Sequence, residues 1–147
     1  MDNSRSEKNP STIRQNKPVY HCALFTGILL IIIAMLHAVL GLYEILAAIR
    51  VGDISKDAAT MITISWIFSG VALFLIGAWI LFLSKDLKNL KRKAWWQGLF
   101  VSGLLTAFGG GCWHYFPLAT YLIGFTMIGL LLFIPLLIYA GHYFSNH

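Results

Sequence analysis

Three ionisable side chains lie inside or beside long apolar stretches of the chain, where charged residues are otherwise rare. They are His37, Glu44 and His114. An ionisable group at membrane depth is expensive to bury without a partner, so it marks a candidate site. One carboxylate and two imidazoles could bind a divalent metal or pass protons to a quinone-like headgroup, and two histidines on facing helices could hold a haem. These three residues, with Ser65, are the candidate ligand-binding residues; no catalytic residue is predicted.

A simpler interpretation gives the same side chains structural roles, and the sequence favours it. Glu44 would touch headgroups and water beside Arg50. His114 would cap a frayed helix end, and His37 would hydrogen-bond a serine or a backbone carbonyl. Ser65 and Ser69 would bond the carbonyls of their own helix turns, as serines in apolar helices commonly do.

Four apolar runs must position these residues. Each is about as long as the ~20 residues that a helix needs to cross the hydrocarbon layer of a bilayer. Charged residues make up 12% of the chain and hydrophobic residues 58%, against about 25% charged residues in an ordinary soluble domain. We therefore expect an all-α membrane protein with four transmembrane helices in an up-down-up-down bundle. The predicted spans cover residues 22–49, 59–83, 95–113 and 117–141.

The chain carries a formal charge of +5, and its basic residues gather in two places. One is the polar segment 1–18, expected to be a disordered cytoplasmic tail; the other is the link SKDLKNLKRK that precedes Trp95. Basic loops stay in the cytoplasm, so residues 19–144 should form one transmembrane domain with both termini inside. The basic residues border the lipid and meet its headgroups, which argues against nucleic-acid binding. Trp95 and Trp96 are expected to anchor the third span at headgroup level.

This topology places the candidate site near the outer surface. The first and third spans both run outward, and at 1.5 Å per residue Glu44 and His114 reach similar heights. These two residues would pair, with His37 about two turns below, around a small outward-facing pocket.

Glycines provide the expected contacts between helices, because small residues let membrane helices approach closely. Gly41 belongs to a small and polar stripe of the first span, and Pro135 should kink the fourth. The glycines assigned to helix packing are Gly41, Gly70, Gly77, Gly124 and Gly129.

The chain resembles a scattered group of small four-span bacterial membrane proteins over roughly residues 24–138. The resemblance rests on a first-span histidine followed by glycine, a Gly- and Leu-rich second span, a basic inner loop and an aromatic-proline turn. In this sequence they read LLIIIAMLHAVLGLYE, GVALFLIGAWILFL, KDLKNLKRK and CWHYFP. The resemblance implies the four-helix architecture and a bacterial inner (plasma) membrane location, but no reaction. The chain is more distantly similar to DoxX-like membrane proteins, some of which are linked to redox complexes, but lacks their internal arginine motif.

No motif for nucleotide binding, serine hydrolysis or zinc proteolysis is present in the sequence. The predicted function is therefore that of a small membrane protein without catalytic machinery. It would be a homo-oligomer or a partner in a larger membrane complex, with no cofactor. The alternative is a ligand, metal or quinone-binding redox module built on the His/Glu pocket, with haem or a divalent metal as the candidate cofactor.

Overall fold

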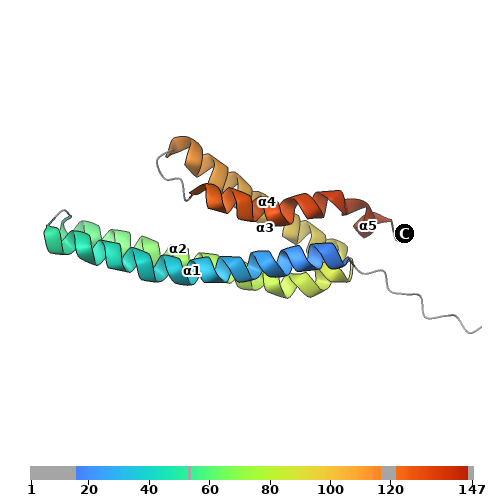
Figure 1. The fold of residues 1–147 in the computed structure, drawn as a ribbon, viewed down its shortest axis with the longest axis horizontal. Helices are drawn as coiled ribbons and strands as arrows, with labels where there is room; N and C mark the ends of the chain where they lie inside the picture. The colour runs from blue at the N-terminus through green and yellow to red at the C-terminus, as the bar shows by residue number, and fades with distance from the viewer. Residues whose placement is uncertain (1–15, 53, 117–121, 146–147) are drawn as a thin grey trace, which may run out of the picture.

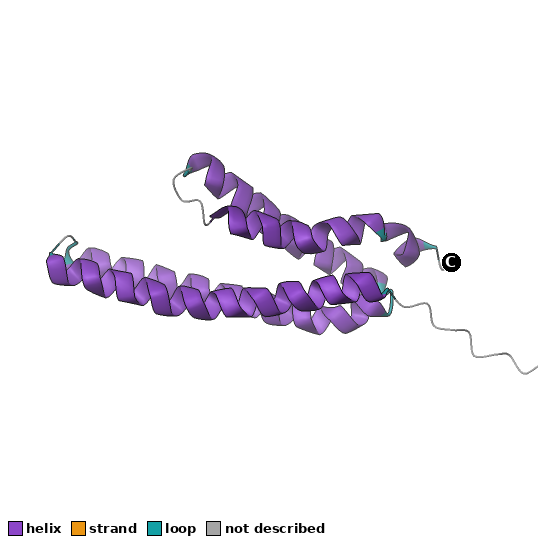
Figure 2. Cartoon of the chain, viewed as in Figure 1, coloured by secondary structure: helices purple, strands orange, loops and turns teal. Residues whose placement is uncertain are grey.

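The computed structural model describes residues 16–52, 54–116 and 122–145, and within these ranges the regular structure is entirely helical (Figure 2). The all-α prediction is confirmed. The predicted tail 1–18 and the predicted turn at Pro117 lie mostly or wholly outside the described residues. The helices are α1 (Lys17–Val51), α2 (Lys56–Lys88), α3 (Arg92–Tyr115), α4 (Ile123–Ile138) and α5 (Ala140–Phe144).

Recognisable capping residues begin the first two helices and end the first. The Asn16 side chain accepts a hydrogen bond from the Val19 amide at the start of α1, and the Ser55 side chain accepts one from Ala58 at the start of α2. Gly52 ends α1 with φ 76°, a left-handed conformation that glycine adopts without strain. Both helices extend a few residues beyond the apolar runs 22–49 and 59–83, because capping and not hydrophobicity determines where they stop.

The helices form two antiparallel hairpins, α1 with α2 and α3 with α4 (Figure 1). The hairpins meet at the end where α1 begins and α5 lies, and they diverge toward the opposite end. We call these the joined end and the open end. Among the described residues α1 packs on α2 and α4 but makes no contact with α3.

The joined end is held by side chains that donate hydrogen bonds to backbone carbonyls of other helices. Trp95 Nε1 donates to the Leu136 carbonyl at 2.8 Å, and the Tyr143 hydroxyl donates to the Leu87 carbonyl at 2.8 Å. Burial also raises the pKa of Tyr143, which keeps its hydroxyl protonated as a donor. Trp95 is only 5% exposed, while Trp96 is 53% exposed, so Trp96 alone matches the expected headgroup anchor.

The fourth apolar segment is interrupted after Pro135. The proline lies inside α4, and the helix continues to Ile138 before a break at Tyr139 separates it from α5. The Tyr139 amide bonds back to the Pro135 carbonyl at 3.0 Å. The Leu136 carbonyl accepts a hydrogen bond from the indole N–H of Trp95. The break in the helix therefore provides the acceptor that the buried Trp95 needs.

The buried core runs from the joined end to the middle of the helices, where Leu30, Ile80 and Leu132 are fully buried. Toward the open end the surface of α1 and α2 is apolar and exposed. Phe68 is 74% exposed there and Val39 is 67% exposed. Of the described helices, α1 and α2 are long and apolar enough to cross a membrane, and α4 is a shorter apolar helix.

Candidate functional site

His37 lies at the contact between α1 and α2, where it is bound to a serine. Its Nε2 atom is 2.8 Å from the Ser69 hydroxyl oxygen. The single hydroxyl proton of Ser69 is donated to the Trp66 carbonyl at 2.8 Å. With this donation, Nε2 carries the hydrogen of the neutral imidazole and donates it to Ser69, and Nδ1 is left as the acceptor. The serine hydrogen bond expected in the simpler interpretation of His37 is thus observed.

Trp66 completes this contact from α2. Its indole ring is stacked on the His37 imidazole, with centroids 4.1 Å apart and planes 8° from parallel. Its Nε1 donates to the His37 backbone carbonyl at 2.7 Å. Gly41, one turn further along α1, leaves the space that the indole occupies, since a Cβ atom there would overlap Trp66. His37, Gly41, Trp66 and Ser69 therefore form one cluster, which we call the His37 cluster.

The His37 cluster satisfies polar groups that would otherwise face an apolar environment. An unpaired polar group costs several kcal/mol in hydrocarbon, which explains why serine, indole and imidazole bond one another. Of the side-chain polar atoms in the His37 cluster, only Nδ1 of His37 has no hydrogen-bond partner among the described residues. Nδ1 is an acceptor in this tautomer, so it could accept a hydrogen bond from a ligand or bind a metal.

Replacing Ser69 with alanine should lower the free energy of unfolding by about 1 kcal/mol, the usual size of an interhelical hydrogen bond in membrane proteins. The measurement is reversible unfolding in detergent micelles with increasing dodecyl sulfate. Ser65, one turn away on α2 and exposed, provides the matched control, and Ser65→Ala should leave the midpoint unchanged. Equal effects of the two substitutions would show that the His37–Ser69 bond contributes nothing.

The other predicted site residues do not join His37. Glu44 is exposed on α1 about two turns away, and His114 is exposed at the end of α3 with its ring against Tyr115. Because α1 and α3 make no contact, Glu44 and His114 do not pair, and the expected pocket is not formed within one chain. The sequence placed Glu44 and His114 at similar heights along their helices. The hairpins diverge at the open end, so the two residues are separated laterally.

His37, Glu44 and His114 do not form one group of candidate metal ligands among the described residues. The described part of the chain contains no group of three or more His, Cys, Asp or Glu side chains that could hold a metal ion. Ser65 is exposed and makes no hydrogen bond with a described residue, so it adds no ligand to His37.

Trp66 and Ser69, which are the two partners of His37 in the structure, were not among the site residues predicted from the sequence. A signal for both was present: a tryptophan deep in an apolar helix needs an acceptor for its N–H, and a glycine on the facing helix leaves room for its ring. Antiparallel pairing of the first two spans places Gly41 opposite Trp66, and this pairing predicts the stack that the structure shows.

The glycines assigned to packing fall into distinct environments. A Cβ atom at Gly77 would lie 2.9 Å from the Gly27 carbonyl oxygen, so this glycine already packs within the chain. Gly129 packs in the same way on Thr106 of α3, and Gly41 on Trp66. Gly70 has only ordinary contacts. Gly124 differs from the expectation, because a Cβ atom there would meet none of the described residues within 4 Å.

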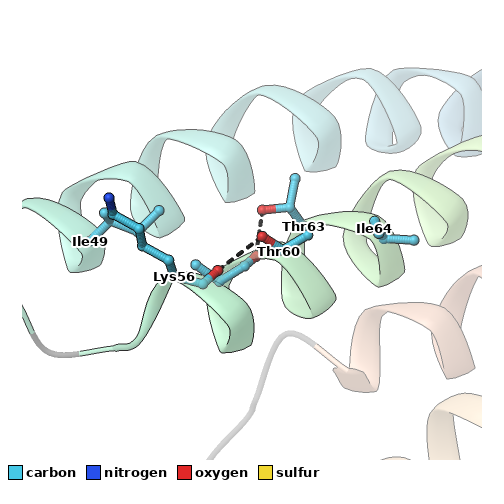
Figure 3. A pocket seen from close by; sticks show the side chains of 6 residues that line it. Ile49, Lys56, Thr60, Thr63 and Ile64 are labelled. Atoms are coloured by element: carbon cyan, nitrogen blue, oxygen red, sulfur yellow. Dashed lines mark hydrogen bonds between the residues drawn. The ribbon is translucent and has the colours of Figure 1, made fainter.

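Two shallow grooves mark the surface of the described helices. The first lies at the open end between α1 and α2, and its Thr60 and Thr63 hydroxyls donate to the Lys56 and Ala59 carbonyls of their own helix (Figure 3). The second follows one side of α3. The residues that line this α3 groove are Trp96, Leu99, Phe100, Gly103, Leu104 and Ala107.

Comparisons of the chain with models of known protein families, with curated proteins and with solved structures found no match.

Proposed function

We propose that this chain is a multi-pass integral membrane protein of the bacterial plasma membrane that crosses the lipid four times and has no catalytic role. Its helices would act as an assembly component, either with further copies of the chain or with a larger complex. One observation carries the proposal: the apolar side chains of α1 and α2 face outward, while His37, Trp66 and Ser69 bond one another between the helices. A water-soluble bundle has the opposite arrangement.

Helix lengths support four crossings. The 24 residues of α3 span about 36 Å, and the 16 residues of α4 about 24 Å before α5 follows. A hydrocarbon layer is about 30 Å thick, so α3 is long enough to cross it, and α4 reaches this length together with α5. The 35-residue α1 exceeds the thickness, which favours a tilted helix.

Charge supports the orientation. Five basic residues belong to the connection between the hairpins at the joined end, and basic segments stay in the cytoplasm. The open end, with Glu44 and His114, would then face outward. The basic residues are Lys85, Lys88, Lys91, Arg92 and Lys93.

Reporter fusions test this topology. A periplasm-active reporter fused after Ile54 should be active, and the same reporter fused after Asn89 should be inactive, because the two positions lie at opposite ends of α2. A cytoplasm-active reporter should give the reverse pattern. Activity of the periplasmic reporter at Asn89, or extraction of the protein into water without detergent, would contradict the four-crossing orientation.

The assembly role is supported by the exposed apolar faces of the diverging hairpins. Gly77 does not add to this outer surface, because it packs on Gly27 inside the chain. Crosslinking in native membranes should recover dimers or hetero-complexes that survive detergent extraction. Recovery of monomers alone, at several crosslinker lengths, would argue against this role.

A second candidate function is supported by the unpartnered Nδ1 atom of His37. A quinol-like ligand with an apolar body could donate its hydroxyl to this atom. Organic extraction of the purified protein would then yield stoichiometric quinone, and His37→Phe would remove it. An extract without quinone, together with an optical spectrum without a haem band, would eliminate this candidate.

A further inference from the structure

We infer that the α3 groove is a binding site for a phosphate-bearing anionic lipid of the cytoplasmic leaflet. The inference rests on the proposed membrane topology. The topology alone would allow any lipid to cover this surface. A site in the α3 groove would instead bind one class of lipid at one position.

The shape of the groove fits one acyl chain. Its residues recur every three or four positions, so they form a single stripe along α3. Phe100 and Leu104, 70% and 56% exposed, line the groove together with Gly103, against which the Phe133 ring of α4 packs. From Trp96 to Ala107 the stripe is about 16 Å long, close to half of a ~30 Å hydrocarbon layer.

Two cations extend the same stripe on the side of the joined end. Arg92 and Lys93 lie one turn before Trp96, at positions that share its helix face. Neither has a carboxylate within ion-pair distance among the described residues, whereas Lys91 is paired with Asp86 at 2.7 Å. The Arg92 guanidinium is held over the Phe144 ring, 4.6 Å from its centroid. Stacking on a ring leaves the N–H donors of a guanidinium free, and arginine binds phosphate through them in a bidentate manner.

Trp96, which is 53% exposed, lies between these cations and the apolar part of the groove. Tryptophan prefers the boundary between headgroups and hydrocarbon, so the groove has the same order of polarity as a lipid molecule. Phosphate would lie at Arg92 and Lys93, the glycerol region at Trp96, and the acyl chain along Gly103. Basic pockets on the cytoplasmic side of membrane helices bind anionic lipids for this reason.

A second copy of the chain fits this groove less well than a lipid. A symmetric contact through the same side of α3 would bring Arg92 and Lys93 of two copies together, with Lys85 and Lys88 nearby. Like charges that face one another across an interface are repulsive. A lipid phosphate instead neutralises them.

The groove at the open end provides a natural comparison (Figure 3). It contains one cation, Lys56, and the adjacent residue is the acidic Asp57. The threonine hydroxyls in this groove are used by their own helix. It therefore lacks the paired, uncompensated cations of the α3 groove and should not select an anionic lipid.

Native mass spectrometry of the full chain in mild detergent tests the inference, with phosphatidylglycerol and phosphatidylcholine added in equal amounts. We expect one phosphatidylglycerol to remain bound after most detergent is removed. The double variant Arg92→Gln/Lys93→Gln should reduce the bound fraction about tenfold, whereas Lys56→Gln should change it less than about twofold. Equal retention of both lipids, or the same retention by the double variant, would show ordinary surrounding lipid only and overturn the inference.

A second variant separates the shape of the groove from its charge. Ala107→Leu narrows the apolar end of the groove at an exposed position and leaves all charges in place. It should weaken phosphatidylglycerol retention without changing the unfolding midpoint. Unchanged retention, or a dimer signal that this substitution abolishes, would assign the groove to something other than a lipid chain. Since the measurement is made on detergent-extracted protein, failure of the reporter topology and failure of lipid selection are distinguishable.

Discussion

Replacing Gly41 with alanine is expected to lower the free energy of unfolding by about 3 kcal/mol. The new methyl group would overlap the Trp66 indole, so the ring must move. Movement would break its 2.7 Å hydrogen bond to the His37 carbonyl and its stacking on the imidazole. Overpacking costs about 1–3 kcal/mol, and the lost hydrogen bond adds about 1 kcal/mol. Unfolding in detergent micelles with dodecyl sulfate measures the change.

Gly70→Ala is the matched control for Gly41→Ala. Gly70 lies on the facing helix beside the same histidine, but a Cβ atom there would be 3.8 Å from the His37 ring, an ordinary contact. The control should leave stability unchanged or raise it by up to about 1 kcal/mol, as alanine favours helix over glycine. Tryptophan fluorescence should shift in Gly41→Ala alone. If the two variants unfold at the same dodecyl sulfate concentration, the indole is not confined by Gly41.

The helices could be predicted from the sequence because their signals are local. The apolar runs of membrane length and the basic link all lie within a few turns of the structure they determine. The serine bond of His37 could also be anticipated, because an imidazole in an apolar helix needs a polar partner. The helix ends were predicted less well, since Asn16 and Ser55 cap the helices outside the apolar runs.

The shared pocket of Glu44 and His114 could not be predicted correctly because it depended on lateral packing. The rise per residue gives a height along a helix but not which neighbour the helix contacts. In the structure α3 packs mainly on α4, and α1 on α2, so residues of equal height lie in different hairpins. Trp95 illustrates the same limit: its neighbour Trp96 is exposed, and only the packing of α4 shows that Trp95 is buried.

A common type of contact joins the helices. Trp66, Trp95 and Tyr143 each donate from a ring N–H or O–H to a backbone carbonyl on another helix, at 2.7–2.8 Å. Each donor belongs to a large aromatic ring. A single contact therefore buries the apolar surface of the ring and also gives its N–H or O–H a hydrogen-bond acceptor. Two of the three lie at the joined end. Of these, the Tyr143 bond to Leu87 links the two hairpins, while the Trp95 bond to Leu136 lies within the α3–α4 hairpin.

The α3–α4 hairpin is packed by a different device, two reciprocal contacts between threonine and glycine. Gly129 of α4 lies against Thr106 of α3, and Gly109 of α3 lies against Thr126 of α4. In each helix the glycine follows the threonine by three residues, so both belong to one face. The neighbouring atoms include backbone nitrogen and carbonyl oxygen, which cannot rotate away as a side chain can.

Gly129→Leu should therefore force α3 and α4 apart and lower the free energy of unfolding by about 3 kcal/mol or more. Gly124→Leu is the control on the same helix, where a Cβ atom would contact no described residue, and it should change stability by less than about 0.5 kcal/mol. The ratio of the two effects is measured by unfolding in dodecyl sulfate. Because both variants add the same side chain to the same helix, a change in hydrophobicity or helix propensity affects both alike. Only close backbone contact distinguishes them, so equal effects would mean that α3 and α4 are not packed through Gly129.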